Sequence, residues 1–496
     1  MTVTSPLALA AVGAIALMTA AMAREPEVQA PARWGEALSE DARAFHDIIL
    51  ENHAGPVDEE NPGFLPLLGA GLDLALSRAP QADSYEHWYF ALREYAASFD
   101  DGHLGLADWA PMGHSWRARW PGFLTGLRSG DEGAEQHEVV FSNGEGLPPV
   151  GAVLVSCDGI GALDLAADRV GRTAGRWNLR SRRNALAHWL FVEQGNPYVH
   201  QPRACLFDHG GVRQQYRIVW DHLDDETQRA AFAAARAPRH FAPVEMRDID
   251  GGIWISMGSF ESDPSSEVGQ RLTALVSEVE ARTEDVRRAA LVVLDLRGNN
   301  GGSSLWPSQI ARALWGEERV AMLGPRSQGV DWRASRGNLE MIESYRDEVF
   351  ADQPEARAWA SQIAAGMAEA LAAGRPLWRQ GEREARPDGT PAPSPVRGQV
   401  FVLTDSGCAS ACLDAVDIFT AMGAVVVGQE TSADSLYMDT RDIALPSGRA
   451  AAFVPMKVFR GRARGNNETV RPAHEWTGDM GDTAALEAWL RGLSGQ

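Results

Sequence analysis

Lysine is nearly absent from this chain. Lys457 is the single lysine among its 46 basic side chains, and all the others are arginine. Acidic residues number 67, so the formal net charge is −21 at pH 7. A chain this acidic repels the phosphates of nucleic acids and of anionic lipids. We therefore expect neither nucleic acid nor an anionic membrane surface as a partner.

Metal-binding patterns are absent as well. The chain has no HExxH motif, no cluster of cysteines and histidines at ligand spacing, and four cysteines in all. We therefore expect no metal and no other cofactor. The 45% share of hydrophobic residues is ordinary for a globular protein. The length of 496 residues suffices for about three domains.

The most informative segment is GCASAC at residues 407–412, which follows the apolar run 400–403 and precedes a helical pattern. At such a strand-to-helix turn the serine hydroxyl is exposed, and the small neighbours leave room for a substrate carbonyl. The unpaired N–H groups of the first helical turn can hold a developing oxyanion. Ser410 is therefore a candidate nucleophile, and an ordinary helix N-cap is the alternative interpretation.

Two further segments accompany this serine. Residues 291–302 (LVVLDLRGNNGG) form a buried-strand pattern that ends in a turn rich in glycine and asparagine. Glycines there would let backbone N–H groups approach a ligand closely. Residues 99–105 (FDDGHLG) place His103 between glycines after a helical pattern. Taken alone, residues 291–302 are typical of a strand-to-helix turn in many α/β proteins. His103 alone is typical of a structural histidine.

The three segments together resemble the S41 family of serine peptidases, which includes the C-terminal processing proteases and the tricorn-type proteases. DLRGNNGG at 295–302 resembles the family's DLRxNxGG turn, and CASA at 408–411 resembles its nucleophile segment. Residues 425–431 (VVVGQET) and 252–260 (GIWISMGSF) resemble strands of the same core. The resemblance implies an α/β (α+β) multidomain fold with an S41 peptidase-like catalytic core.

The resemblance also points to the catalytic base. The processing proteases pair their serine with a downstream lysine, where this chain has Ser435. Lys457 lies further along in residues 453–459, which predict an edge strand carrying a solvated charge. The tricorn-like branch uses a histidine before the core, and DGH at 101–103 resembles its Asp-Gly-His segment. His103 is therefore the expected general base, a role that suits an imidazole at neutral pH.

The chain departs from the tricorn-like pattern at two places. That branch has a serine beside the histidine, where this chain has Gly102. It also uses a glutamate near the C-terminus, for which Glu468 is the candidate here, with Asn466 nearer the expected place. Three other carboxylates compete for the same orienting role: Asp100, Asp101 and Glu430.

The N-terminal residues 1–23 predict a signal peptide. An uninterrupted run of small and apolar residues from 7 to 23 ends in Ala-Met-Ala before the polar residues 24–26. An uncleaved membrane anchor is the alternative, and no other membrane domain is expected. Either interpretation predicts a body that is exported to the periplasm or secreted.

Export would permit disulfides. The four cysteines allow three pairings. Of these, Cys408 with Cys412 would bracket Ser410, and Cys157 would pair with Cys205 in the middle region. Free buried thiols are the alternative.

Periodicity divides the rest of the chain into three parts. Residues 24–124 predict an N-terminal helical cap that carries the histidine. Residues 125–242 predict a β-rich, PDZ-like domain, because residues 147–160 resemble a PDZ strand that runs into an Asp-Gly turn. Residues 243–496 alternate strands and helices, as in an α/β core. Within the core, residues 325–397 predict a helical insertion with a proline-rich linker, either a lid or a solvated helical excursion.

We therefore predict an exported serine endopeptidase that hydrolyses peptide bonds of a peptide or protein substrate. Ser410 would be the nucleophile of an acyl-enzyme and His103 the general base. The backbone N–H of Ala411 and that of Gly301 or Gly302 would hold the oxyanion.

Two alternatives remain. A catalytically silent peptide-binding protein with the same fold would explain the missing serine before His103 and the poorly placed acid. A thiol hydrolase would use Cys408 or Cys412, but neither cysteine occupies the family's nucleophile position.

Overall fold

The computed structural model describes residues 33–107, 118–129, 134–236, 240–326, 328–351, 353–381 and 389–494. These residues form two compact units. The N-terminal unit holds the described residues between 23 and 237 together with 440–456, and the core unit holds those between 238 and 439 together with 457–494. The predicted signal peptide at 1–23 lies outside the described residues. No helix in the described ranges is both long and apolar enough to cross a bilayer.

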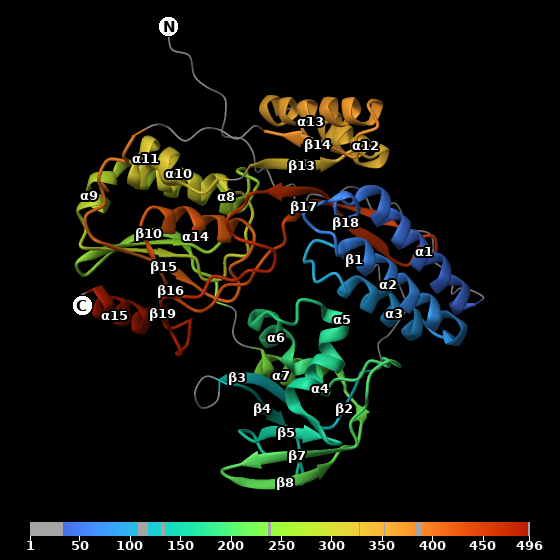
Figure 1. Cartoon of the computed structure of the whole chain (residues 1–496). Coiled ribbons are helices and arrows are strands. Elements are labelled where there is room, and N and C mark those ends of the chain that lie inside the picture. The colour runs from blue at the N-terminus through green and yellow to red at the C-terminus, as the bar shows by residue number, and fades with distance from the viewer. Residues whose placement is uncertain are drawn as a thin grey trace. The chain divides into compact units, whose positions relative to one another are not determined.

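The N-terminal unit begins with helices and continues with short strands (Figure 1). Its first elements are α1 (Trp34–Asn52), η1 (Gly55–Val57), α2 (Phe64–Arg78), η2 (Ala79–Gln81), α3 (Tyr85–Ala97) and β1 (Gly105–Ala107). Its later elements are β2 (Arg119–Trp120), β3 (Phe123–Ser129), β4 (Glu135–Ser142), β5 (Val153–Cys157), β6 (Ile160–Gly161), α4 (Ala162–Ala166), η4 (Ala167–Gly171), α5 (Arg172–Ala174), α6 (Arg180–Leu186), η5 (Ala187–Phe191), β7 (Ala204–His209), β8 (Val212–Arg217), β9 (Asp221–His222) and α7 (Asp225–Ala235).

Helices α1, α2 and α3 pack around one apolar core. Helix α1 turns a stripe of apolar side chains inward, because Leu38, Phe45 and Ile49 recur at helical spacing and are fully buried. The buried indole of Trp88 in α3 donates to Asp41 of α1 at 2.8 Å. This packing supports the segment that leaves α3 and carries the predicted base.

The second part of this unit is an antiparallel sheet in the order β3-β4-β5-β7-β8, with β6 paired to β5. Strand β5 runs into a turn at Asp158 and Gly159, both with positive φ. Cys157 and Cys205 face each other in the β5–β7 register and form a disulfide. The cross-link joins two neighbouring strands of the sheet.

The core unit alternates strands and helices. Its elements are β10 (Val244–Ile249), β11 (Gly252–Met257), α8 (Glu267–Ala281), α9 (Thr283–Arg288), β12 (Leu291–Asp295), α10 (Leu305–Trp315), α11 (Glu317–Leu323), β13 (Gly329–Arg333), α12 (Arg336–Ser344), η6 (Tyr345–Val349), α13 (Pro354–Ala372), β14 (Leu377–Gln380), β15 (Gln399–Thr404), α14 (Ala411–Ala421), β16 (Val425–Gly428), β19 (His474–Glu475) and α15 (Thr483–Ser494). Strands β17 (Tyr437–Ala444) and β18 (Ala451–Arg460) pass from one unit to the other.

The main sheet of the core unit has the order β10-β11-β12-β15-β16-β19. Strands β11, β12, β15, β16 and β19 run parallel to one another, and β10 is antiparallel to β11. Helices α8, α10 and α14 cover one face and α15 covers the other (Figure 1). Every residue of β12 is buried, because its alternate side chains enter the apolar cores on the two faces.

The predicted helical insertion contains strands as well as helices. Strand β13 pairs antiparallel with β14 and with the end of β18, so the insertion begins and ends in a sheet. Helix α13 buries Ile363 and Met367, and its Gly366 lies against the ring of Trp378. Helix α13 is therefore packed on one face, and the alternative of a solvated helical excursion stays a prediction. A role as a lid stays a prediction.

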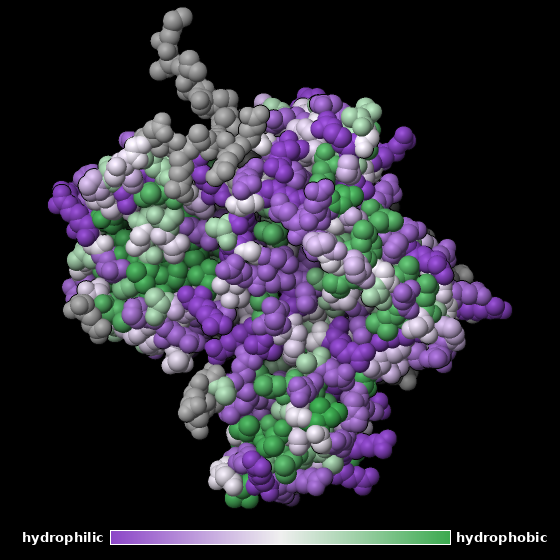
Figure 2. Space-filling view, viewed as in Figure 1, coloured by the Kyte–Doolittle hydropathy of each residue, from purple (hydrophilic) through white to green (hydrophobic). Residues whose placement is uncertain are grey.

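Most charged side chains of both units lie at the surface. Figure 2 shows hydrophilic and hydrophobic residues interspersed over the face in view. Among the buried polar side chains of the N-terminal unit are His137 in β4 and His188 in η5, which are both 2% exposed. Burial lowers the pKa of each to about 4. Both side chains are therefore neutral in the folded protein at neutral pH.

These two histidines should make the N-terminal unit sensitive to acid. In the unfolded chain a histidine binds its proton near pH 6.5, whereas His137 and His188 bind theirs only near pH 4. The free energy of unfolding should fall as the pH drops from about 6.5 to 4, by up to about 1.4 kcal/mol per pH unit for each histidine. In urea unfolding experiments, the free energy of unfolding of a His137→Gln/His188→Gln variant should depend less steeply on pH than that of the wild type. Parallel slopes for variant and wild type would contradict this expectation.

Candidate active site

Ser410 stands at the N-cap of α14 in an unusual backbone conformation. Its φ is 54° and its ψ is −127°, a region that costs a residue with a side chain about 1 to 3 kcal/mol. Its side chain makes no capping hydrogen bond. Ser410 therefore occupies the N-cap position without capping the helix through its side chain, unlike an ordinary N-cap serine. A strained strand-to-helix turn that presents a serine is the geometry of a nucleophile elbow.

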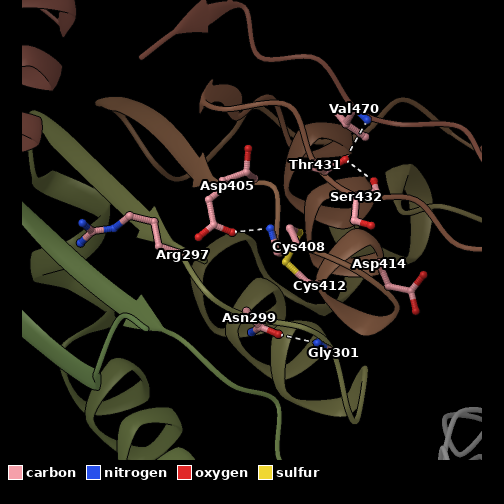
Figure 3. Close-up of a disulfide and its surroundings, with 12 residues drawn as sticks. Arg297, Asn299, Gly301, Asp405, Cys408, Cys412, Asp414, Thr431, Ser432 and Val470 are labelled. Carbon is pink, nitrogen blue, oxygen red and sulfur yellow. Dashed lines mark hydrogen bonds between the residues drawn. A yellow bond between two sulfur atoms is a disulfide. The ribbon is translucent and has the colours of Figure 1, made fainter. Parts of the chain in front are cut away.

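The elbow is held by a disulfide and by a buried carboxylate (Figure 3). Cys408 and Cys412 are fully buried and joined, with their Cα atoms 5.3 Å apart, so they bracket the serine. Asp405, at the end of β15, accepts hydrogen bonds from Gly407 N at 2.9 Å and from Gly298 N at 2.8 Å. One carboxylate therefore joins the elbow to the turn that follows β12.

That second turn comes close to the serine. Gly301 and Gly302 have φ of 108° and 124°, which favours glycine. A Cβ built on Gly301 would lie 2.7 Å from the Cβ of Ser410 and 3.1 Å from the backbone N of Ala411. Any larger residue at this position would push the two turns apart. The structure thus brings the predicted nucleophile and the predicted oxyanion residues together.

The two glycines differ as hydrogen-bond donors. Gly301 N already donates to the Asn299 side chain at 2.9 Å. Gly301 O accepts from Phe260 N at 3.2 Å, so the N–H of Gly302, in the same planar peptide, points away from Phe260. Within the described ranges, no protein acceptor is recorded for the N–H of Gly302 or of Ala411. These two groups are the better candidates for an oxyanion hole.

The DLR part of the motif has a structural role. Arg297 is 1% exposed and donates to Asp295 at 2.6 and 2.9 Å, to Met480 O at 2.5 Å and to Thr483 at 3.2 Å. Trp254 donates to the same aspartate at 3.1 Å. The pair anchors the end of β12 to the segment before α15, which orients the glycine turn.

His103 lies in the N-terminal unit, between α3 and β1, and is half-buried. Its backbone N donates to Asp101 at 2.8 Å, which forms a tight local turn. A Cβ on Gly102 would lie 2.7 Å from the guanidinium of Arg176, so a side chain at this position would require Arg176 to move. Because Ser410 belongs to the core unit, the pairing of His103 with it stays a prediction.

Glu468, Glu430 and Asn466 are each held by a hydrogen bond within the core unit. Glu468 is exposed and accepts from Gly465 N at 2.7 Å. Glu430 accepts from the hydroxyl of Thr469. Asn466, nearer the family position, accepts from Leu436 N at 3.1 Å. The orienting role of Glu468 stays a prediction.

Lys457 is neither exposed nor on an edge. It lies in β18, which has β13 and β17 as partners, and its side chain is 10% exposed. Its ammonium pairs with Asp439 at 2.7 Å and lies 5.0 Å from the ring centre of Trp332 and 5.2 Å from that of Phe459. The expectation of a solvated edge charge is wrong, because β13 comes from the distant insertion and covers this strand.

Asn299 and Asp405 were missed as site residues in the sequence. Asn299 uses its amide to join Gly301 N to Met257 O, the latter at 2.7 Å. The signal in the sequence for both residues was a polar side chain in the turn that follows a buried strand, β12 for Asn299 and β15 for Asp405. Among the residues with described positions, no group of three or more histidine, cysteine, aspartate and glutamate side chains is arranged to hold a metal ion.

Removal of the buried lysine should cost stability. A Lys457→Met variant leaves the largely buried Asp439 without its ion-pair partner, so the free energy of unfolding should fall by about 1 to 3 kcal/mol. Adding Asp439→Asn should recover part of the loss, since asparagine also tolerates the positive φ at this position. Chemical denaturation of both variants measures the difference. A single variant as stable as wild type would contradict the role of the pair.

The sequence matches no family model and no curated protein. Solved structures do resemble the chain. Mature CPAF is 13% identical with a TM-score of 0.55, over 89% of this chain and 93% of its own. Mature CPAF complexed with lactacystin is 12% identical with a TM-score of 0.55, over 93% and 98%. The photosystem II D1 C-terminal processing protease is 12% identical with a TM-score of 0.30, over 90% and 94%.

The likeness to mature CPAF shows the fold of the chain. The predicted mixed α/β multidomain class is confirmed by the helices and sheets of both units. The chain has the fold of mature CPAF, which confirms at the level of the fold the S41 peptidase-like architecture expected from residues 295–302 and 408–411.

Proposed function

We propose that this protein is a serine endopeptidase that cleaves peptide bonds through an acyl-enzyme on Ser410. The observation that carries the proposal is the strained conformation of this serine, 54° in φ, beside a glycine turn. Backbone strain of this kind persists where the surrounding structure enforces it, and it concentrates at active sites. The unbonded N–H groups of Ala411 and Gly302 add the electrostatic part of such a site.

The proposed reaction has two halves. His103 accepts the proton of the Ser410 hydroxyl as the oxygen attacks the scissile carbonyl, and the N–H groups of Ala411 and Gly302 hold the oxyanion. His103 then returns the proton to the leaving amine, which releases the first product. A water molecule, activated by the same histidine, hydrolyses the acyl-enzyme and restores Ser410. Loss of one oxyanion donor typically costs about 100- to 1,000-fold in rate.

We also propose that the protein acts outside the cytoplasm. All four cysteines are paired in two disulfides, a state that oxidising compartments favour. The apolar N-terminal run at 7–23 supports the same conclusion as a signal peptide or an anchor. The protein would then act on peptides or proteins in the periplasm or outside the cell.

A catalytically silent peptide-binding protein is the second candidate. It is favoured by the Arg176 guanidinium beside Gly102 and by the local hydrogen bond of the exposed Glu468. Labelling with a serine-reactive fluorophosphonate separates the two candidates, because an activated serine reacts and a silent pocket does not.

Ser410→Ala should abolish fluorophosphonate labelling and lower peptide hydrolysis by at least about 1,000-fold, because it removes the attacking oxygen. The fold should remain intact, as circular dichroism and thermal unfolding would report. Ser410→Gly should be equally inactive but at least as stable as Ser410→Ala, since glycine adopts a positive φ at low cost. Full hydrolysis by Ser410→Ala would reject the nucleophile.

His103→Ala should lower the rate of acylation by about 100- to 10,000-fold, because no general base remains for the serine proton. Single-turnover kinetics with an ester substrate measures this step. Lys457→Met protein that remains folded should acylate at the wild-type rate. This variant is the control for a lysine base, which the processing proteases of the family use. If His103→Ala acylates normally and Lys457→Met does not, the assignment of the base is wrong.

A further inference from the structure

An ionic cluster, buried at Arg464 and Asp434 and partly exposed at Asp414, lies beside the Ser410 turn in the core unit. Its members are Asp414 and Asp417 of α14, Asp434, Arg462 and Arg464. The side chain of Arg464 is 4% exposed and pairs with all three aspartates, at 3.2 Å from Asp414 and 3.1 Å from Asp417. The arginines therefore hold one oxygen of Asp414 in place.

The other oxygen of Asp414 reaches the oxyanion turn. It accepts a hydrogen bond from the hydroxyl of Ser304 at 2.7 Å, across a sequence separation of 110 residues. Ser304 follows Gly302 by two positions, and Asp414 follows Ser410 by four, in the first turn of α14. This bond joins the end of the glycine turn to the helix that begins at the nucleophile.

The Ser304 hydroxyl does not make the capping hydrogen bond that is usual for a serine at its position. Ser304 occupies the N-cap of α10, where a serine commonly accepts a hydrogen bond from its own helix, yet it makes no capping bond. Ser303 accepts from Leu305 N instead, at 3.3 Å. The hydroxyl of Ser304 is therefore used for the contact between the two turns.

The two turns are held together at both ends. Before the catalytic groups, Asp405 accepts from Gly298 N and Gly407 N. After them, Asp414 accepts from Ser304. Gly301 O and Ser303 N also bond to Phe260 on either side of Gly302, so the links through Asp405 and Asp414 are those that set the turn relative to Ser410 and α14. An oxyanion hole needs its donors within a few tenths of an ångström of their working positions, because misplacement by about 1 Å costs about 100-fold in rate.

We propose that Ser304 and Asp414 are positioning residues that set the place of the Gly302 N–H relative to Ser410 and Ala411. The inference rests on the proposed function, since it concerns the oxyanion hole of that same site. Donors to an oxyanion act mainly in the transition state. Loss of the link should therefore lower kcat and leave KM nearly unchanged.

The test is Ser304→Ala, measured with a peptide or ester substrate. We expect kcat to fall about 10- to 100-fold with KM within about twofold of wild type. Ser308→Ala is the matched control, because that hydroxyl lies in the same helix and donates only to Ser304 O, at 2.8 Å. It should keep the wild-type kcat. Ser304→Thr keeps a hydroxyl at the same place and should recover most of the activity.

Three results would overturn the role. They are a wild-type kcat in Ser304→Ala, an equal loss in Ser308→Ala, and a loss that matches the fraction of unfolded protein. Fluorophosphonate labelling separates this proposal from the proposed function. If wild type labels at Ser410 and Ser304→Ala is as active, only the positioning role fails. If wild type neither labels nor hydrolyses substrate, the proposed function fails and the positioning role fails with it.

Discussion

The candidate site depends on one buried carboxylate, that of Asp405. It follows β15 directly and accepts backbone hydrogen bonds from Gly298 and Gly407, which belong to the two turns of the site. Burial raises the pKa of this carboxyl, and the two N–H donors offset part of that effect. An aspartate at the end of a parallel strand can satisfy donors from both loops because the ends of neighbouring parallel strands lie at one edge of the sheet.

At this edge of the sheet, both a serine and two glycines adopt backbone conformations with positive φ. Ser410 has a positive φ although it carries a side chain, whereas Gly301 and Gly302 meet the same demand without a steric penalty. The disulfide between Cys408 and Cys412 and the hydrogen bonds of Asp405 restrict the ways in which the elbow can relax. Rigid support of this kind is what a preorganised oxyanion hole requires.

Charged groups are buried around the site, and each has several partners. Arg297 is shared among Asp295, Met480 and Thr483. Arg464 is shared among three aspartates. Buried ion pairs contribute little net stability, because desolvation opposes their attraction. Their directional hydrogen bonds do define the positions of the loops, which matters more at this edge of the sheet than net stability does.

The sequence by itself determined the local parts of this protein. The apolar runs specified β12 and β15, and the small residues and glycines that follow them specified the turns that carry Ser410 and Gly301. These signals are local, since they depend on strand burial and on the conformational freedom of glycine. Tertiary structure decided the partners. Lys457 is buried because β13 arrives from the insertion, and Ser304 meets Asp414 across 110 residues. No local pattern encodes such contacts, because they exist only once parallel strands bring distant loops to the same edge.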